Sequence, residues 1–371
     1  MQFKEITGLE TVKQQLIGGH KKGKTAHAQL FLGREGSGAL GMALSYATYL
    51  HCEDKQGDDS CGVCPSCIKM SKLVHPDTHF LYPSTASLKS SEDTADPLID
   101  SWRQFATSGI YGNITSWAFQ AGLENKQLSI SADPMRAMMK RISLKAFESD
   151  YKIVIVWLAE YMNSTAANAV LKVLEEPSEG TVFLLVSNDL NKILTTIKSR
   201  CQLVNIPLFT DEDVQSFLSK QYSGVDTDLI DTTVRQAEGN LNFAINKLTG
   251  ESTDFMIFFR NWMRMCYASK YAELVQLSEE FQQMGKIAQH GLIDFGLFIL
   301  RRSMLHLNNI EQAIGHESSF VQGFSKTLNE NIILHFTQLL NETAYHLERN
   351  ASPKICFLNL SINLSKVFKL K

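Results

Sequence analysis

The sequence predicts an α/β domain built on a parallel sheet, followed by an all-helical region. Two observations lead to this fold class. Over the first 207 residues, short apolar runs alternate with stretches whose apolar residues recur at helical spacing, as they do in βαβ units. Beyond Pro207 no strand-like run stands out, and each later apolar pattern has helical spacing.

The predicted strands are short and apolar, and the run from Lys152 to Leu158 is apolar enough to be buried on both faces of a sheet. An aromatic-rich stretch, 99–130, is expected to be an ordered and partly helical insertion. The strands are predicted at 30–32, 79–82, 152–158, 181–186 and 202–206. Helices are predicted around them at 9–22, 39–47, 133–147, 166–176 and 193–198.

We expect three domains in the 371 residues. The α/β domain spans 1–207 and contains an insertion at about 84–130, a small helical lid spans 208–250, and a larger helical domain spans 251–371. A capping box that starts at Thr210 begins the lid, and 250–252 is a plausible linker. The helices of the last domain are predicted at 255–267, 272–282, 287–307, 332–347 and 355–368.

Composition is that of a globular protein, with 44% hydrophobic and 20% charged residues. The net charge of -3 leaves any nucleic-acid contact to local patches or to a partner. No run of about 18 apolar residues is present, so no membrane span is expected. Lys4 and Glu5 stand where a signal peptide needs an apolar core, and we expect a cytoplasmic protein with reduced thiols.

A glycine-rich turn between the first predicted strand and its helix has the spacing of a phosphate-binding loop. Gly33 and Gly38 stand where the pattern G-x-x-x-x-G-K-[ST] requires glycine, and Gly36 lies between them. The next two positions should be Lys and Ser or Thr, but they are Ala39 and Leu40. The lysine charge for the outer phosphates and the hydroxyl for Mg²⁺ are therefore missing. The alternative is a glycine-rich turn with no link to nucleotides.

Four of the seven cysteines, Cys52, Cys61, Cys64 and Cys67, are spaced C-x8-C-x2-C-x2-C. Four thiolates so close in the chain fit a closed, tetrahedral and structural Zn²⁺ site. An iron–sulfur cluster is an alternative, but no C-x3-C-P continuation follows the last cysteine. Free buried thiols are the other alternative. Lone cysteines, which we expect to be small buried hydrophobic residues, are Cys201, Cys266 and Cys356.

Five stretches carry a family resemblance. They are 27–33, which leads into the glycine-rich turn, the four cysteines, His75-Pro76-Asp77, the segment 168–177 that ends in Leu-Glu-Glu-Pro, and Ser199-Arg200-Cys201. In this order they resemble the clamp-loader AAA+ ATPases, and among these the delta-prime subunits of the bacterial DNA polymerase III clamp loader. The resemblance implies an AAA+-type sheet domain with a Cys₄ zinc module, a small helical lid and a C-terminal helical collar that serves oligomerisation.

The departures from the family pattern concern ATP chemistry. The family places acidic residues at the end of the strand after Lys152, where this sequence has Trp157 and Leu158, with Glu160 further on. It also places an arginine in the lid where this sequence has Asn242. Because Lys, hydroxyl, acid pair and lid arginine are all absent, we expect no ATP hydrolysis by this chain.

Arg200 is the candidate catalytic residue that survives. In the family, the arginine of Ser-Arg-Cys points across the subunit interface at the γ-phosphate of the neighbour, where such a finger stabilises the charge that develops in phosphoryl transfer. The resemblance therefore implies that Arg200 acts in trans, on the ATP of a neighbouring subunit. The alternative is a solvated arginine at a helix end.

The resemblance implies a non-catalytic subunit of the DNA polymerase III holoenzyme that helps to load the sliding clamp on primed DNA. Its expected partners are clamp-loader motor subunits, a clamp-opening subunit and the sliding clamp, with DNA bound mainly through the complex. Two rival functions are an ATP-hydrolysing motor subunit, which Ala39 and Leu40 oppose, and a zinc-dependent nucleic-acid-binding module outside replication. The acidic net charge and the acidic residues of the cysteine loop oppose the second rival.

Overall fold

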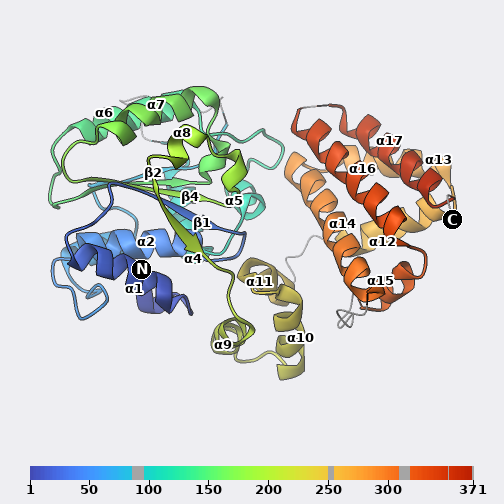
Figure 1. The fold of residues 1–371 in the computed structure, drawn as a ribbon, viewed down its shortest axis with the longest axis horizontal. Helices are drawn as coiled ribbons and strands as arrows, with labels where there is room; N and C mark the ends of the chain where they lie inside the picture. The colour runs from blue at the N-terminus through green and yellow to red at the C-terminus, as the bar shows by residue number, and fades with distance from the viewer. Residues whose placement is uncertain (86–95, 250–254, 309–317, 350, 370–371) are drawn as a thin grey trace. The chain divides into compact units, whose positions relative to one another are not determined.

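The computed structural model describes residues 1–85, 96–249, 255–308, 318–349 and 351–369 (Figure 1). The chain forms two compact units. The first comprises Met1–Leu123, Gln127–Ile230 and Ala237–Ile245, and the second comprises Glu124–Lys126, Asp231–Gln236 and Asn246–Lys371. The division into three domains at 207 and 250 stays a prediction, and the predicted linker at 250–252 lies outside the described residues.

A five-stranded parallel sheet forms the centre of the first unit, in the order β2-β3-β4-β1-β5. The central strands β3 and β4 are buried along their whole length, as their continuous apolar sequences predict. The predicted parallel sheet is therefore confirmed. The strands are β1 (Ala28–Gly33), β2 (Thr78–Leu81), β3 (Lys152–Trp157), β4 (Thr181–Ser187) and β5 (Gln202–Ile206).

Helices cover both faces of this sheet (Figure 1). α6 (Ala132–Ser143) and α7 (Ser164–Glu175) lie side by side on one face and bury Met135, Val170 and Leu174 against β3 and β4. α2 (Ala39–His51) lies on the other face and is buried along its whole length. The other helices that begin in the α/β region are α1 (Glu10–Lys21), α3 (Pro65–Ser71), α4 (Ile99–Ser108), α5 (Ile114–Gln120) and α8 (Thr195–Lys198), with short 3₁₀ turns at Phe3–Glu5, Ala159–Tyr161 and Leu190–Lys192.

Where it is described, the predicted insertion is an ordered segment between β2 and β3. Ser84 and Ser129 join its two ends, because each backbone N–H donates to the carbonyl of the other at 3.0 and 2.9 Å. Between them, α4 and α5 bury Trp102 and Trp117 completely. The aromatic residues that argue for order in the sequence are therefore core residues.

Three helices follow the last strand: α9 (Asp211–Gln221), α10 (Thr227–Ala237) and α11 (Leu241–Thr249). The capping box predicted at Thr210 is present, because its hydroxyl accepts from the N–H of Asp213 and the Asp213 carboxylate accepts from the N–H of Thr210.

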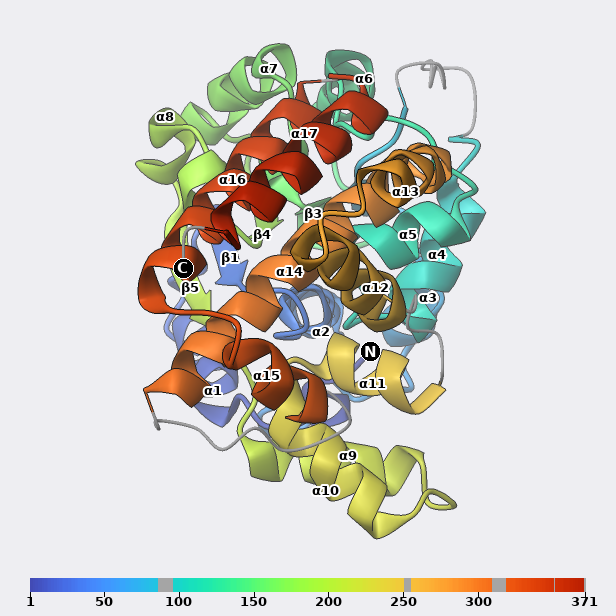
Figure 2. The same ribbon diagram turned by 90° about the vertical axis from the view of Figure 1, so that its right-hand side faces the viewer.

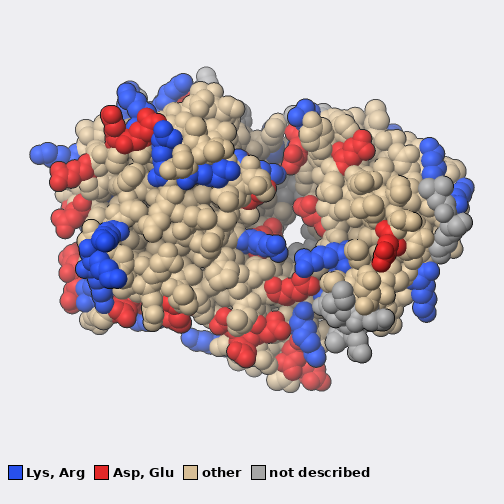
Figure 3. Space-filling view, in the orientation of Figure 1, with Lys and Arg blue, Asp and Glu red and all other residues tan. Residues whose placement is uncertain are grey.

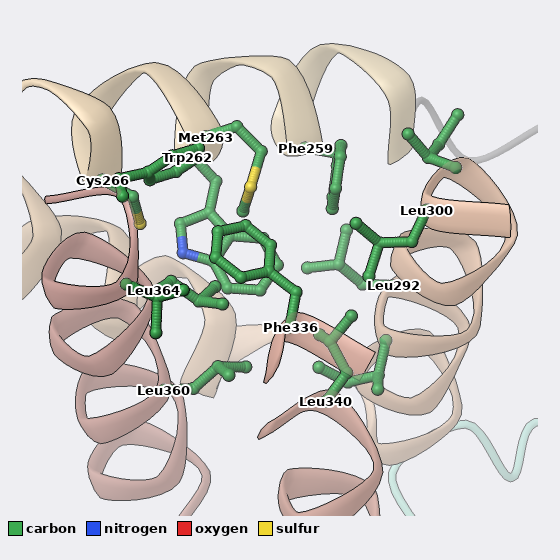
Figure 4. Close-up of a cluster of buried hydrophobic side chains, with 14 of the residues drawn as sticks. Phe259, Trp262, Met263, Cys266, Leu292, Leu300, Phe336, Leu340, Leu360 and Leu364 are labelled. Atoms are coloured by element: carbon green, nitrogen blue, oxygen red, sulfur yellow. The ribbon is translucent and has the colours of Figure 1, made fainter. Parts of the chain in front are cut away.

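The second unit is all-helical where it is described, and α16 and α17 lie side by side in it (Figure 2). Its hydrophobic core combines aliphatic and aromatic side chains. Phe259, Trp262 and Phe336 are buried in it, and the indole N–H of Trp262 donates to the Ser361 hydroxyl at 2.8 Å (Figure 4). The helices are α12 (Phe255–Tyr267), α13 (Tyr271–Gln283), α14 (Lys286–Leu307), α15 (Ser318–Ser325), α16 (Glu330–Glu348) and α17 (Pro353–Val367).

The structure confirms the predicted fold class, α/β followed by helices, and corrects several details. α6 ends at Ser143 and not at Phe147, and the helix predicted at 193–198 begins only at Thr195. α3 and α15 were not predicted from the sequence. Cys266 is buried as expected, but Cys201 and Cys356 are only partly buried. Among the described residues, no helix is both long and apolar enough to cross a membrane.

Candidate functional site

The glycine-rich turn connects β1 to α2 and is covered by side chains of the same unit. Gly36 and Gly38 have positive φ angles of 76° and 77°, which glycine adopts without steric cost. A Cβ atom on Gly36 would collide with the side-chain amide of Asn240. Leu241 donates its backbone N–H to the carbonyl of Gly36 at 3.3 Å. The turn is therefore in close contact with the start of α11.

Glu35, inside the turn, is held by two amide side chains from distant parts of the sequence. The Nδ2 atoms of Asn113 and Asn242 both donate to its Oε1 atom, at 2.7 and 3.0 Å. Asn113 comes from the insertion, and Asn242 stands where the family places its lid arginine. Both of these contacts to the turn come from uncharged donors.

The N-terminus of α2, where a phosphate would be bound, is covered by aromatic rings. Tyr111 from the insertion and Phe209 both lie within 3.3 Å of the place that a Cβ atom on Gly38 would take. The two rings meet edge to face with centroids 5.7 Å apart, and burial raises the pKa of Tyr111 to about 12. Ala39 and Leu40 are themselves buried, so no polar side chain replaces the missing lysine and hydroxyl at these two positions.

The end of β3, where the family has its acid pair, is also apolar. Trp157 lies in an aromatic cluster with centroid distances of 5.4 Å to Trp102 and 5.0 Å to Phe105. Leu158 is buried. Glu160, the nearest carboxylate in sequence, is partly buried. This partial burial raises its pKa, and it accepts the backbone N–H of Asn188 at 2.9 Å. Glu160 therefore fixes the end of β4.

Arg200 lies just after α8 and just before β5, and about a third of its side chain is exposed (34%). Its Nη1 atom donates to the carbonyl of Thr196 at 2.8 Å, which satisfies a free carbonyl near the helix end. Its Nη2 atom lies 2.6 Å from Oε1 of Glu175, the last residue of α7. The sequence did not indicate a role for Glu175, because Glu175 and Arg200 are 25 positions apart and only the fold brings them together.

The structure brings the four predicted cysteines together. The sulfur atoms of Cys52, Cys61, Cys64 and Cys67 all lie within 4.8 Å of one another, and those of Cys61 and Cys67 are 3.9 Å apart. Tetrahedral Zn²⁺ with bonds of about 2.3 Å separates its sulfur ligands by about 3.8 Å. The four residues therefore fit a zinc-type site and can hold a metal ion.

Backbone N–H groups point at these sulfur atoms. Cys61 accepts N–H groups from Val63 and Cys64, at 3.4 and 3.2 Å, and the first of these contacts contributes most to lowering its pKa to about 7. Burial raises the pKa of Cys52 and of Cys67. Cys64 caps α3, whose first residue is Pro65. The loop is thus arranged to stabilise thiolates once a cation neutralises them.

Two acidic residues of the cysteine loop, Asp58 and Asp59, contact the first 21 residues of the chain. The Asp59 carboxylate accepts the backbone N–H groups of Phe3 and Lys4, each at 3.0 Å. Asp58 pairs with Lys21. These contacts tie the loop to the sheet unit through α1 and the first 3₁₀ turn.

The His-Pro-Asp motif has a structural role that the sequence did not reveal. The Asp77 carboxylate accepts three backbone N–H groups, from Phe147, Glu148 and Ser149, at 2.5, 2.9 and 3.0 Å. Burial alone would raise the pKa of Asp77, but these three donors lower it. The motif therefore anchors the connection between α6 and β3.

Comparison with known proteins gives concordant matches. A sequence profile described as "DNA polymerase III, delta subunit" matches residues 8–210. The DNA polymerase III subunit delta' of Yersinia pestis is 29% identical over 188 residues, which are 51% of this chain and 44% of that protein. The subunit delta' of Bacillus subtilis is 26% identical over 220 residues, which are 59% of this chain and 54% of that protein. The chain thus spans about half the length of these curated relatives.

Among solved structures, a DNA polymerase III gamma subunit-related protein from Thermotoga maritima aligns over 97% of this chain and 99% of that chain, at 15% identity and a TM-score of 0.38.

Proposed function

Because the chain belongs to the DNA polymerase III delta-subunit family, we propose that it is a delta-prime-type clamp-loader subunit that does not hydrolyse ATP. In this role it assembles with motor subunits and a clamp-opening subunit, and the complex places a sliding clamp on primed DNA in the cytoplasm. Arg200 supplies an arginine finger to the ATP of a neighbouring motor subunit.

One observation supports the non-hydrolysing role: apolar side chains of the chain lie where a nucleotide and its Mg²⁺ would need polar groups. The turn after β1 lacks the lysine and the hydroxyl, and Tyr111 and Phe209 cover the N-terminus of α2. Trp157, at the position of a Mg²⁺ ligand, packs among other aromatic rings. An ATP-hydrolysing motor subunit would need both regions to be polar and accessible.

The proposed finger is supported by the position of Arg200. Its guanidinium is anchored at one side by Thr196 and Glu175, and it remains partly exposed at the end of α8. Arginine stabilises phosphate charge by bidentate hydrogen bonds, and it stays charged at every pH that proteins tolerate. A partly exposed arginine at a fixed helix end is suited to act on a group that another subunit brings to it.

We also propose that the cysteine cluster holds structural Zn²⁺. All four ligands come from the protein, so no position stays open for a substrate. The ion would link the loop around α3 to the C-terminal end of α2, where Cys52 lies.

The net charge of -3 and the charges on one face of the molecule favour DNA binding through the complex over DNA binding by this chain alone. In the view of Figure 3, Lys and Arg are interspersed with Asp and Glu over the described residues, and no large surface is purely basic. A chain that bound DNA alone would be expected to concentrate its positive charge. The net charge and the mixed charges of this face oppose a nucleic-acid-binding module outside replication.

Two measurements test the proposed function. The purified chain should show no ATP turnover, and Ala39→Lys should not create any, because the Mg²⁺ ligand is still missing. A clamp loader reconstituted from motor subunits, clamp-opening subunit and this chain should load clamps on primed circular DNA. Omission of the chain should abolish loading. Turnover by the pure chain, or full loading without it, would contradict the proposal.

A further inference from the structure

Glu175 and Arg200 form an ion pair between α7 and the end of α8. Oε1 of Glu175 lies 2.6 Å from Nη2 of Arg200. α7 and α8 lie side by side (Figures 1 and 2), so the pair spans a short gap between two helices of the same unit. The carboxylate is half exposed (50%), and the pair is therefore in contact with solvent.

The position of Glu175 is unfavourable without a cation beside it. It is the last residue of α7, where the free carbonyl groups give the helix end a partial negative charge. The guanidinium of Arg200 neutralises this end. The same end is fixed from the other side, because the carbonyl of Leu174 is 3.0 Å from Nε2 of His27, at the entrance to β1. The end of α7 that carries Glu175 is therefore held in place.

The contacts of Arg200 use only one part of its guanidinium. Nη1 donates to the Thr196 carbonyl at 2.8 Å and approaches the Ser199 hydroxyl at 3.4 Å, and Nη2 contacts Glu175. A guanidinium has five N–H donors in a rigid fork. Nε donates to no acceptor among the described residues, and Nη2 has a second N–H group. A pair of donors therefore remains for an incoming anion.

We propose that Glu175 is a positioning residue for Arg200: it holds the guanidinium so that its free donors face the phosphate of the neighbouring subunit's ATP. This inference rests on the proposed function of Arg200. The carboxylate does not touch the ATP. It fixes the side chain before the two subunits meet, and thereby removes the loss of side-chain freedom that a mobile arginine would suffer on binding phosphate.

The chain offers a matched control for this role. Glu176 follows Glu175 directly, is exposed, and has no ion-pair partner among the described residues. Glu175→Gln removes the charge and keeps the shape, and Glu176→Gln makes the same chemical change one residue away. Because exposed ion pairs contribute little to folding stability, both variants should melt at the wild-type temperature.

The test is steady-state ATP hydrolysis by the reconstituted clamp loader, with the clamp and primed DNA present. Glu175→Gln should lower kcat by about two- to fivefold, as expected for replacing a charge-assisted hydrogen bond by a neutral one, and leave KM unchanged. Glu176→Gln should have no effect. Arg200→Ala should lower kcat further. In the Arg200→Ala background, Glu175→Gln should change nothing more, because Glu175 acts only through that arginine.

The outcomes separate this inference from the function it rests on. If Arg200→Ala slows the complex but Glu175→Gln does not, or if Glu175→Gln accelerates it, Glu175 does not position the finger. An equal loss from Glu175→Gln with and without Arg200 also overturns the inference. If Arg200→Ala itself has no effect on an assembled complex, the arginine finger is wrong, and the inference is overturned with it.

Discussion

Single carboxylates, one buried and one partly buried, fix loops of this protein that lie far away in the sequence. Asp77 receives three backbone N–H groups from 147–149, and Glu160 receives one from Asn188. Hydrogen bonds to an ionised acceptor are stronger than neutral ones, and burial strengthens them further. These residues therefore contribute to the geometry around the sheet.

Asp77→Asn should destabilise the sheet unit by about 2–4 kcal/mol, because an amide cannot accept all three N–H groups and its own NH₂ faces donors. Urea unfolding, followed by tryptophan fluorescence, measures this change. Asp58→Asn, the control, removes an exposed partner of Lys21 and should leave the urea midpoint close to that of the wild type. Equal stability of the Asp77→Asn variant and the wild type would contradict the anchoring role.

His79, on β2, should make stability depend on pH. Burial first, and then the charge of Arg141, lower its pKa to about 4, whereas in the unfolded chain it is about 6.5. As the pH falls from 6.5 to 4, the unfolded chain binds a proton that the folded chain does not, so stability falls.

Between pH 7 and pH 5, His79 should account for a loss of about 2 kcal/mol. The pH dependence of urea unfolding in His79→Gln should be weaker than in the wild type by this amount. An unchanged dependence would show that His79 is protonated equally in the folded and unfolded chains.

At the scale of elements, the loop around α3 depends on its sulfur cluster. It has few buried apolar residues of its own, with Cys67 and Met70 inside α3. A small segment with little core is commonly stabilised by a metal ion. The N–H groups that point at the sulfur atoms would pair with thiolates in the metal-bound form.

Purified protein should contain about one Zn²⁺ per chain, as one Cys₄ site requires. Chelation, or Cys64→Ser, should release it and speed hydrogen exchange at the amides of Cys61 and Cys67, while β3 and β4 stay protected. Cys356→Ser, outside the cluster, serves as the control. Metal analysis that finds iron, or no metal, would contradict the zinc assignment.

The strands and most long helices could be predicted because their apolar periodicity is a local property. The end of α6 could not, since the three residues after Ala146 are held in place by Asp77, a residue about 70 positions earlier. The role of the insertion was hidden for the same reason. Its aromatic composition predicts order, but nothing local indicates that Tyr111 would meet Phe209 over the turn after β1.

For the candidate sites too, local features could be predicted from the sequence and contacts between distant segments could not. Cysteine spacing predicts the cluster, because all four residues are close in the chain. The replacement of the phosphate-loop lysine and hydroxyl residue by Ala39 and Leu40 is visible in the sequence itself. The partners that surround Glu35 and Arg200 come from segments that are distant in the sequence, and only the fold brings Asn113, Asn242 and Glu175 to them.

At the scale of the whole molecule, the two units differ in structure, and we propose different roles for them. The first unit contains the parallel sheet, a glycine-rich turn that is covered by side chains, and a partly exposed Arg200. The second is an all-helical unit, where described, with its own hydrophobic core (Figure 4). In the proposed assembly, the second unit serves oligomerisation and the first presents the arginine to a neighbour.

The most direct test of this account is ATP hydrolysis by clamp loaders that contain Arg200→Ala, Arg200→Lys or the exposed control Arg136→Ala. Assembly should be unchanged in gel filtration, because truncation of a partly exposed side chain costs little stability. An arginine finger contributes roughly 10³-fold or more at the site it serves, and Lys lacks its bidentate geometry. We therefore expect both Arg200 variants to slow hydrolysis and clamp loading, with partial loss because other sites keep their own fingers. Wild-type rates from assembled Arg200→Ala complexes would contradict the account.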